Sequence, residues 1–389
     1  MNLEQIVKAL NDCLPSKNRP IHLHVPCFSG KEWEYTKACL DERMVSSVGS
    51  QVDRFERLLE EYTGASHVVA VVNGTAALHV ALQLIKVKQN EEILLPSMTF
   101  VATANAIAYC NAIPHFVDCE SDRLGVDADK LEAYLKSIAE LRSDACYNKK
   151  TGSRIRGLIA VHIFGHPVDL DPLIDVCDRY HIELIEDAAE SLGSFYKDRH
   201  TGTFGKVSTL SFNGNKIITT GGGGAILTND PGLAHLAKHL TTTAKMPHPW
   251  EYMHDHVGHN YRLPNINAAL GCAQLEQLPK FLRQKRALAS HYKSRFDSLS
   301  GIQFFTEPEF AKSNYWLNSL ILDPENANHL TPLLELTREH GIMTRPIWKL
   351  MHMLPMYKGC PRMDLSVSEN LSRRIFNIPS SAILGGGND

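Results

Sequence analysis

Short runs of apolar, often β-branched residues alternate between about residues 50 and 230 with segments of helical periodicity. In the helix predicted over residues 52–64, apolar side chains recur at i, i+3, i+4 and i+7, and Gly64 then stops the helix. Further helices are predicted at residues 75–85 and 171–180. Strands are predicted from the apolar runs at residues 67–72, 92–97, 113–118, 156–165, 182–187, 208–213 and 224–229.

Continuous apolar strands separated by helices are typical of a mostly parallel sheet that is buried on both faces. A long helical stretch follows at residues 264–300, and then a smaller α+β unit with a strand at 315–322 and a helix at 329–341. We therefore predict an α/β fold, preceded by a short helix and an extended arm and ending in a frayed "GGGND" tail. The N-terminal helix and arm, the large α/β domain and the small α+β domain are predicted to span residues 1–30, 31–280 and 281–389, respectively.

Composition narrows the class of protein without identifying a reaction. The net charge of −3 over 389 residues gives no basic face for nucleic acid. Nine cysteines include no Cys-x-x-Cys pair, and their odd number favours a reducing compartment. No stretch reaches the roughly 18 apolar residues of a membrane span, and the N-terminus lacks the apolar core of a signal peptide. We predict a cytoplasmic protein without membrane association or a bound metal.

Ligands of a parallel sheet bind beyond the carboxyl ends of its strands, so the residues that follow each strand are candidates for a site. Gly74 and Thr75 follow the strand at 67–72 and begin a helix, where free backbone N–H groups and the helix dipole can hold a phosphate. Phe100 follows the strand at 92–97 and could lie over a flat ring. Taken singly, these residues have ordinary alternatives as a helix cap and a core side chain.

Two charged residues also lie at or after the ends of predicted strands, farther along the chain. Asp187 ends a predicted strand, and a carboxylate desolvated there needs a partner, such as a protonated ring nitrogen. Lys216 is the only ionisable side chain between Lys206 and Asp230, and this setting favours a nucleophilic amine kept apart from carboxylates. Ser211 is a second candidate ligand for phosphate. Taken singly, these residues would be a helix cap, an exposed lysine and a strand hydroxyl.

These features occur in the order phosphate loop, aromatic ring, aspartate and lysine, all at strand ends of one sheet. This combination is what pyridoxal phosphate requires of a protein. The lysine would join the cofactor covalently, the aspartate would keep its ring nitrogen protonated, and the aromatic side chain would stack on its ring. Nucleotide motifs do not match, because no Gly-x-Gly-x-x-Gly follows the first strand and "GNKIITTGGGG" reverses the order of a P-loop. No cluster indicates a catalytic triad or a metal site.

The chain resembles the DegT/DnrJ/StrS sugar-nucleotide aminotransferases, a family of fold-type I pyridoxal-phosphate enzymes. The similar segments lie in the family's order between about residues 25 and 280: "NGTAALHVAL", "PSMTFVATANAI", "GHPVDLDPL", "IEDAAESLGS", "SFNGNKIITTGGGGAILTND" and "GHNYRLPNINAALGCAQLEQL". The resemblance implies that Lys216 carries the cofactor, that Asp187 faces its ring nitrogen and that Phe100 stacks on its ring. It also implies a set of phosphate ligands: Gly74, Thr75 and Ser211.

The resemblance further implies a homodimer with its active sites at the interface. In this family the segment that matches "GHNYR" crosses the interface, so Asn260 would contact the phosphate of the partner subunit's cofactor. The alternative for Asn260 and Arg262 is a loop turn and a surface charge.

Two departures from the family's pattern concern the site. Glu190 stands where many members have a glutamine or a histidine against the cofactor's ring oxygen, and a glutamate there must be protonated or turn away. Residues 221–224 are four glycines, where the family often has Gly-Glu-Gly-Gly. This variant, together with "VSSVGS" and "LLPSMTF", is most similar to the subgroup that makes the 4-amino group of legionaminic acid and bacillosamine precursors.

The implied reaction transfers the amino group of L-glutamate to a nucleotide-linked, 2-acetamido 4-keto-6-deoxyhexose, for bacterial surface polysaccharide or nonulosonic acid biosynthesis. Transamination at another sugar position and sugar dehydration are the alternatives, although the family's dehydratases have a histidine in place of Lys216. A non-catalytic binding protein is a third alternative, which the intact Lys216 and Asp187 disfavour. Sugar contacts are expected from the N-terminal arm, the loop at 242–262 and the region from Arg345 to His352, where surface packing is the alternative role.

Overall fold

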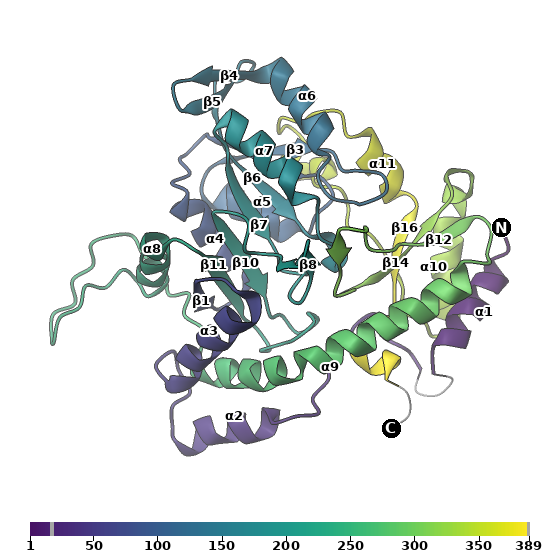
Figure 1. Cartoon of the computed structure of the whole chain (residues 1–389), viewed down its shortest axis with the longest axis horizontal. Coiled ribbons are helices and arrows are strands. Elements are labelled where there is room, and N and C mark those ends of the chain that lie inside the picture. Colours follow the sequence, from purple (N-terminus) through teal and green to yellow (C-terminus); the bar gives the residue numbers. More distant parts are fainter. Residues whose placement is uncertain (16–18, 387–389) are drawn as a thin grey trace.

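The computed structural model describes residues 1–15 and 19–386, so the last three residues of the predicted tail lie outside it. Within these residues a nine-stranded sheet forms the centre of the molecule (Figure 1). Seven of the strands lie side by side in the order β1 (His67–Val71), β11 (Gly224–Thr228), β10 (Val207–Ser211), β7 (Glu183–Asp187), β6 (Arg154–Val161), β2 (Glu92–Pro96) and β3 (Ile113–Val117). The other two form a hairpin beside β6, which was not predicted: β4 (Ala139–Arg142) and β5 (Ala145–Asn148).

The sheet is mostly parallel, as predicted, and β11 is the exception among the seven strands. It runs antiparallel to both of its neighbours, β1 and β10. Residues 212–223 join β10 to β11 without a helix, whereas parallel neighbours are joined by crossovers that usually include one. The chain therefore reverses at the end of β10, and this reversal places Lys216 and the glycine run at the carboxyl edge of the sheet.

Helices cover both faces of the sheet, as its apolar strands predict. One face carries α4 (Gly74–Leu84), α5 (Val101–Tyr109) and α8 (Pro231–Thr241). The opposite face carries α3 (Ser50–Thr63), α6 (Ala128–Ile138), α7 (Leu170–Tyr180) and part of α9 (Asn265–Phe296). An additional helix, α2 (Glu32–Asp41), packs on α9.

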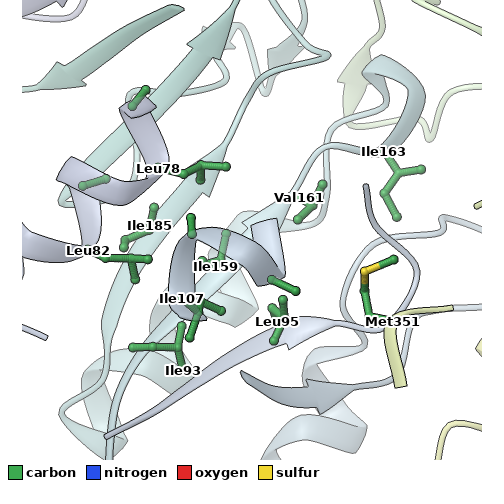
Figure 2. Close-up of a cluster of buried hydrophobic side chains, with 14 of the residues drawn as sticks. Leu78, Leu82, Ile93, Leu95, Ile107, Ile159, Val161, Ile163, Ile185 and Met351 are labelled. Carbon is green, nitrogen blue, oxygen red and sulfur yellow. The ribbon is translucent and has the colours of Figure 1, made fainter. Parts of the chain in front are cut away.

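The alternation of side chains along β2 shows how both faces become buried. Ile93 and Leu95 belong to the cluster under α4 and α5 in Figure 2, whereas Leu94 belongs to the cluster under α6 and α7. Burying each such side chain stabilises the fold by about 1.5–3 kcal/mol. In the same view Leu78 and Leu82 anchor α4 to the sheet, which fixes the N-terminus of this helix at the carboxyl edge.

A second, four-stranded antiparallel sheet follows in the C-terminal part of the chain. It comprises β12 (Ile302–Phe304), β14 (Asn318–Leu322), β16 (Ile375–Ile378) and β15 (Arg345–Pro346), accompanied by α10 (Leu330–Glu339) and α11 (Ser366–Ser372). The predicted strand and helix of this unit are thereby confirmed. Three short strands pair separately: β8 (Phe195–Tyr196), β9 (Arg199–His200) and β13 (Ala311–Lys312).

The N-terminal helix α1 (Leu3–Cys13) packs beside the second sheet. Its apolar residues share a cluster with Tyr292 and Phe296 of α9 and with Phe376 of β16. The predicted division of the chain at residues 30 and 280 stays a prediction, and α9 continues unbroken through residue 280. In the part of the chain that the structure describes, no helix combines the length and apolar character needed to cross a bilayer.

Candidate active site

A cavity of about 320 Å³ lies at the carboxyl edge of the central sheet. The turns after β1, β2, β7 and β10 contribute to its wall, and Trp316 and Trp348 contribute from the C-terminal part of the chain. The cavity brings together seven of the residues predicted from the sequence: Gly74, Thr75, Phe100, Asp187, Glu190, Ser211 and Lys216. A larger hollow of about 580 Å³ at the other end of the strands, near Glu183 and Lys206, contains none of them.

Lys216 lies in the connection between β10 and β11, and its side chain is only 12% exposed. Its Nζ is 3.8 Å from the centre of the Trp316 ring. The same nitrogen donates a hydrogen bond to Oε1 of Glu190 over 3.2 Å. The expectation that Lys216 stands apart from carboxylates is therefore wrong, because the turn after β7 brings in a glutamate from 26 positions earlier in the chain.

Glu190 is buried and faces the cavity instead of turning away. Its second oxygen, Oε2, accepts a hydrogen bond from the N–H of Phe164 over 2.8 Å. Burial raises the pKa of the Glu190 carboxyl, and the charge of Lys216 opposes that rise. A backbone donor and a cation thus hold this carboxyl in place.

Asp187 is the last residue of β7, and it is 5% exposed. Its Oδ2 accepts a hydrogen bond from the hydroxyl of Thr103 over 2.8 Å, and its Oδ1 accepts one from the N–H of Ala189 over 3.2 Å. Burial raises the pKa of Asp187 above its usual value, in spite of these donors. A cation placed in the cavity would stabilise the ionised form. The sequence analysis did not identify Thr103, which reaches Asp187 from α5.

Glu186, the residue before Asp187, points to the other side of the strand and is fully buried. Its oxygens accept hydrogen bonds from His162 (3.0 Å), from Ser208 (3.2 Å) and from the backbone N–H groups of Gly202, Phe204 and Gly205 (2.7 Å each). Burial raises the pKa of Glu186, but these hydrogen bonds together bring it below the usual value. This carboxylate therefore has all the partners that a buried charge needs.

The N-terminus of α4 forms one end of the cavity. Asn73 caps the helix by accepting a hydrogen bond from the N–H of Ala76 over 2.8 Å, so that Gly74 and Thr75 are its first residues. A Cβ at Gly74 would lie 2.9 Å from Cβ of Ser211, so the helix start and this serine are in direct contact. Helix N–H groups beside two hydroxyls make a donor set that suits a phosphate.

Aromatic side chains line the cavity beyond Asp187. Phe100 precedes α5 and is half exposed, and its ring centre lies 6.2 Å from that of Trp348. Trp348 also packs on Phe164, with a distance of 5.2 Å between the ring centres. Trp316 is held by its indole N–H, which donates to the carbonyl oxygen of Asn215 over 2.7 Å. Phe100 was predicted from the sequence, Trp348 lies within the region 345–352 predicted to contact the sugar but was not singled out, and Trp316 was not predicted.

The glycine run meets two separate steric demands. Gly221 has φ of +80°, a left-handed conformation that favours glycine. A Cβ at Gly224 would lie only 2.6 Å from the carbonyl carbon of Asn73, so this glycine lets the two turns approach. A Cβ at Gly222 would have the carbonyl oxygen of Val72 as its nearest neighbour, 3.8 Å away. A side chain therefore fits at residue 222, the position where the family often has its glutamate.

Three other residues that the sequence analysis named lie outside the cavity wall, although Trp348, within the predicted region from Arg345 to His352, forms part of it. Asn260 is exposed, and its Oδ1 accepts hydrogen bonds from Arg262 over 3.3 Å. Arg345 is exposed in β15. His352 is buried, with Nδ1 2.7 Å from Oγ of Ser97, which agrees with a packing role.

The cavity fits pyridoxal phosphate by its chemistry. A lysine amine, a buried carboxylate whose hydrogen bonds from the described residues come from uncharged donors, an aromatic wall and a phosphate-binding helix start all border one volume. Each part meets one requirement of this cofactor. Fold and site together define a pyridoxal-phosphate-dependent enzyme.

Comparison with known proteins identifies the family within this class. The model of the DegT/DnrJ/EryC1/StrS aminotransferase family matches residues 26–387. The chain belongs to this family, and it is a pyridoxal-phosphate-dependent aminotransferase.

Relatives match the chain over nearly its whole length. It is 38% identical to EpsN of Bacillus subtilis (strain 168), over 94% of this chain and 92% of that protein. It is 36% identical to the GDP-perosamine synthase of Vibrio cholerae, over 92% of this chain and 94% of that protein. It is 31% identical to the UDP-4-amino-4,6-dideoxy-N-acetyl-beta-L-altrosamine transaminase of Campylobacter jejuni (88% of both). Among solved structures, the aminotransferase TlmJ from Streptoalloteichus hindustanus matches with a TM-score of 0.83 and 25% identity, over 92% of this chain and 93% of TlmJ. The predicted fold class, enzyme class and cofactor are thus confirmed.

Proposed function

We propose that the protein transfers the amino group of L-glutamate to C4 of a nucleotide-linked 4-keto-6-deoxyhexose that carries a 2-acetamido group. The reaction would serve the biosynthesis of a surface polysaccharide or nonulosonic acid, in the cytoplasm. The observation that carries the proposal is the convergence of the Lys216 amine and the buried Asp187 carboxylate on one cavity beside a phosphate-binding helix start.

Two relatives support the choice of substrate. The name of the Campylobacter jejuni transaminase specifies a UDP-linked, N-acetylated sugar with a 4-amino-4,6-dideoxy pattern. The name of the Vibrio cholerae synthase specifies a GDP-linked sugar, perosamine. The legionaminic acid and bacillosamine subgroup, proposed from the glycine run and the "VSSVGS" segment, agrees with the first of these substrates.

Lys216 is the proposed catalytic residue for proton transfer. Pyridoxal phosphate, when bound, supplies an electron sink that acidifies the carbon atom next to the amino group. The Nζ of Lys216 takes the proton from the α-carbon of glutamate in the first half-reaction. In the second half-reaction the same nitrogen delivers a proton to the former keto carbon of the sugar. Trp316, 3.8 Å from this nitrogen, and the burial of the side chain limit the access of water.

The other cavity residues orient the cofactor. Asp187 would hold the proton on the ring nitrogen, and the hydroxyl of Thr103 orients its carboxylate for that contact. Gly74, Thr75 and Ser211 would bind the phosphate, with Phe100 against the ring. Glu190 would contact the cofactor from the side of Lys216, the position that its two hydrogen bonds already give it.

A homodimer is part of the proposal. Asn260 would bind the phosphate of the cofactor in the partner subunit, which is why it lies outside the cavity of its own chain. The neighbouring segment exposes apolar side chains that a second copy would cover: Met246, Trp250, Tyr252, Met253 and Val257. Light scattering would test the dimer, and Asn260→Ala should weaken cofactor binding without changing the oligomeric state.

The decisive experiment is a screen of nucleotide-linked 4-keto and 3-keto sugars with glutamate as amino donor. Product mass and stereochemistry would identify the substrate, and the panel should include GDP-linked and UDP-linked sugars with and without the 2-acetamido group. We expect amination at C4 of a 2-acetamido sugar. Amination at another carbon would overturn the regiochemistry, and loss of water without amination would identify a dehydratase.

Lys216→Ala tests the role of the lysine apart from the choice of substrate. Turnover should fall by at least about 10³-fold, because one residue provides both the covalent attachment and the proton transfer. Borohydride should fix the cofactor to the wild-type chain at residue 216 and leave the variant unlabelled. Steady turnover in the variant would refute the role assigned to Lys216.

A further inference from the structure

Two histidines and an aspartate meet where a long segment leaves α8. His239 lies in the last turn of that helix, whereas Asp255 and His256 lie on the returning half of the segment. Oδ1 of Asp255 is 2.6 Å from Nε2 of His239 and 3.0 Å from Nδ1 of His256. Among the described residues this group is the one in which three such ligand atoms all lie within 4.8 Å of one another.

The fold of the segment explains why His239 meets two residues that lie 16 and 17 positions later in the chain. Thr242 forms a β-bridge with Asn260, and Lys245 forms one with His254. The N–H of Met246 also donates to the carbonyl oxygen of Met253 over 2.8 Å. The segment therefore doubles back as a hairpin, which projects from the body of the molecule beside α8 in Figure 1. Its two halves close at the helix end that carries His239.

We propose that His239, Asp255 and His256 bind a divalent transition-metal ion, with zinc as the best match. Two imidazoles, a carboxylate and an open fourth position form a ligand set that zinc commonly takes. Metal–ligand distances of about 2.0–2.2 Å place tetrahedral ligand atoms roughly 3.3 Å apart. The present separations from Oδ1 of Asp255 are 2.6 and 3.0 Å, and the two imidazole nitrogens lie within 4.8 Å of each other, so metal binding would require the carboxylate to move away from both rings and the rings to stay close together. Asp255 and His256 are exposed, so such movements are sterically open.

A metal at this site would link the end of α8 to the returning half of the hairpin. The tip of the hairpin carries Trp250 and Tyr252, which are 77% and 79% exposed. Fixing the base would restrict the directions in which this tip can point. None of the three residues borders the cofactor cavity of its own chain, so zinc binding can be measured apart from transamination, although the hairpin is also the segment that the proposed homodimer would cover.

The competing interpretation is a purely hydrogen-bonded cluster, in which both imidazoles donate to Asp255. Asp255→Asn separates the two, because asparagine keeps the size and an acceptor oxygen but loses the charge that a metal requires. His239→Ala removes one ligand outright. His235→Ala is the matched control, since His235 lies one turn earlier on α8 and stacks on His239 with the ring centres 6.5 Å apart.

Full-length protein, treated with chelator and then freed of it, would be titrated with zinc chloride in a calorimeter. We expect one zinc per chain at micromolar affinity or tighter for the wild type and for His235→Ala. Affinity should fall by at least about 100-fold in His239→Ala and Asp255→Asn, because even indirect partners of metal ligands contribute 10–100-fold. Cobalt substitution should give visible absorbance without the near-ultraviolet band of thiolate ligands, which excludes binding at cysteines.

Three results would overturn the proposal. Zinc binding that is only millimolar in the wild type would mean an ordinary surface cluster. An unchanged affinity in Asp255→Asn would identify a site elsewhere, and an equal loss in His235→Ala would point to damage of α8. Zinc should also raise the thermal unfolding temperature of the wild type but not of His239→Ala, so a shift of equal size in both proteins would contradict the site.

Discussion

Glu186 and Asp187 are neighbours at the end of one buried strand, yet their surroundings differ in kind. Glu186 accepts five hydrogen bonds, three of them from the backbone of the segment 202–205. Asp187 accepts two and borders the cavity. The pKa of Glu186 is lowered by its partners, whereas the pKa of Asp187 is raised by burial. One of two adjacent carboxylates thus has its partners within the protein, whereas the other borders the cavity, where we propose that it meets a ligand.

This difference indicates how a carboxylate that binds a ligand can be distinguished from one that stabilises the fold. A carboxylate that already accepts hydrogen bonds from several protein donors has no acceptor position left for a ligand. Its removal leaves those donors without a partner and destabilises the fold. A carboxylate that is buried but short of donors is unfavourable until a cation arrives. We therefore propose that the less satisfied member of the pair is the functional one, and substitutions should separate a loss of activity from a loss of stability.

The largest expected effect is that of Asp187→Asn on turnover. Asparagine cannot stabilise a protonated ring nitrogen, so kcat should fall by about 10³-fold. The free energy of unfolding of the cofactor-free protein should stay the same or rise, because a poorly solvated charge has been removed. Kinetics with glutamate and the keto sugar, together with urea unfolding, would measure both quantities. Full activity in this variant would remove Asp187 from the catalytic site.

Glu186→Gln should instead lower the stability of the fold. We expect the free energy of unfolding to fall by about 3 kcal/mol, because the amide presents donors to backbone N–H groups that need an acceptor. Glu183→Gln on the same strand is the control, since Glu183 only pairs with the partly exposed Lys206 over 2.7 Å. That exposed pair contributes about 0–1 kcal/mol. Equal losses in the two variants would contradict the contrast.

The same strand shows how much of the site the sequence predicts. The run "IELIED" was sufficient to predict β7 and to place Asp187 at the carboxyl edge, because strand ends of a parallel sheet converge there. It could not separate the roles of the two carboxylates. The donors that saturate Glu186 come from His162 and from the segment 202–205, and no local pattern shows that these groups converge.

The C-terminal wall of the cavity was beyond prediction for a similar reason. Trp316 binds the carbonyl oxygen of Asn215 across 101 positions of sequence. Which side of "YWLNSLIL" faces the cavity depends on how the second sheet packs against the first, and periodicity does not determine that packing. The contact between Lys216 and Glu190 is likewise a product of packing, so the lysine was expected to be free of carboxylates.

A smaller effect is expected at the hydroxyl that orients Asp187. Thr103→Val keeps the shape of the side chain and removes the 2.8 Å hydrogen bond to Oδ2. We expect kcat to fall by at least about tenfold, because a hydrogen bond to a charged group contributes about 1.5–3 kcal/mol and each 1.4 kcal/mol or so corresponds to a factor of ten in rate. Thr103→Ser retains the hydroxyl and should restore most of the activity. An unchanged kcat in Thr103→Val would show that Asp187 needs no positioning.

The smallest expected effect concerns pH. It is the change with pH in the difference between the unfolding free energies of the wild type and Glu186→Gln. The folded-state pKa of Glu186 lies below its unfolded value, so its contribution is fully present above the unfolded pKa of about 4.3 and is lost as the pH falls through the folded pKa. The difference should be constant from pH 8 to pH 6 and should shrink as the pH falls from 6 to 4, by at most about 0.6 kcal/mol. Burial lowers the pKa of His166 to about 3, and this histidine destabilises both proteins alike in acid, so its contribution cancels in the difference. Burial also lowers the pKa of His200, to about 4, but the charge of Glu186 opposes that shift in the wild type, so the contribution of His200 cancels only above about pH 4. Urea unfolding of both proteins across this pH range would measure the difference in unfolding free energy. A difference that grows toward acid would reverse the sign assigned to Glu186.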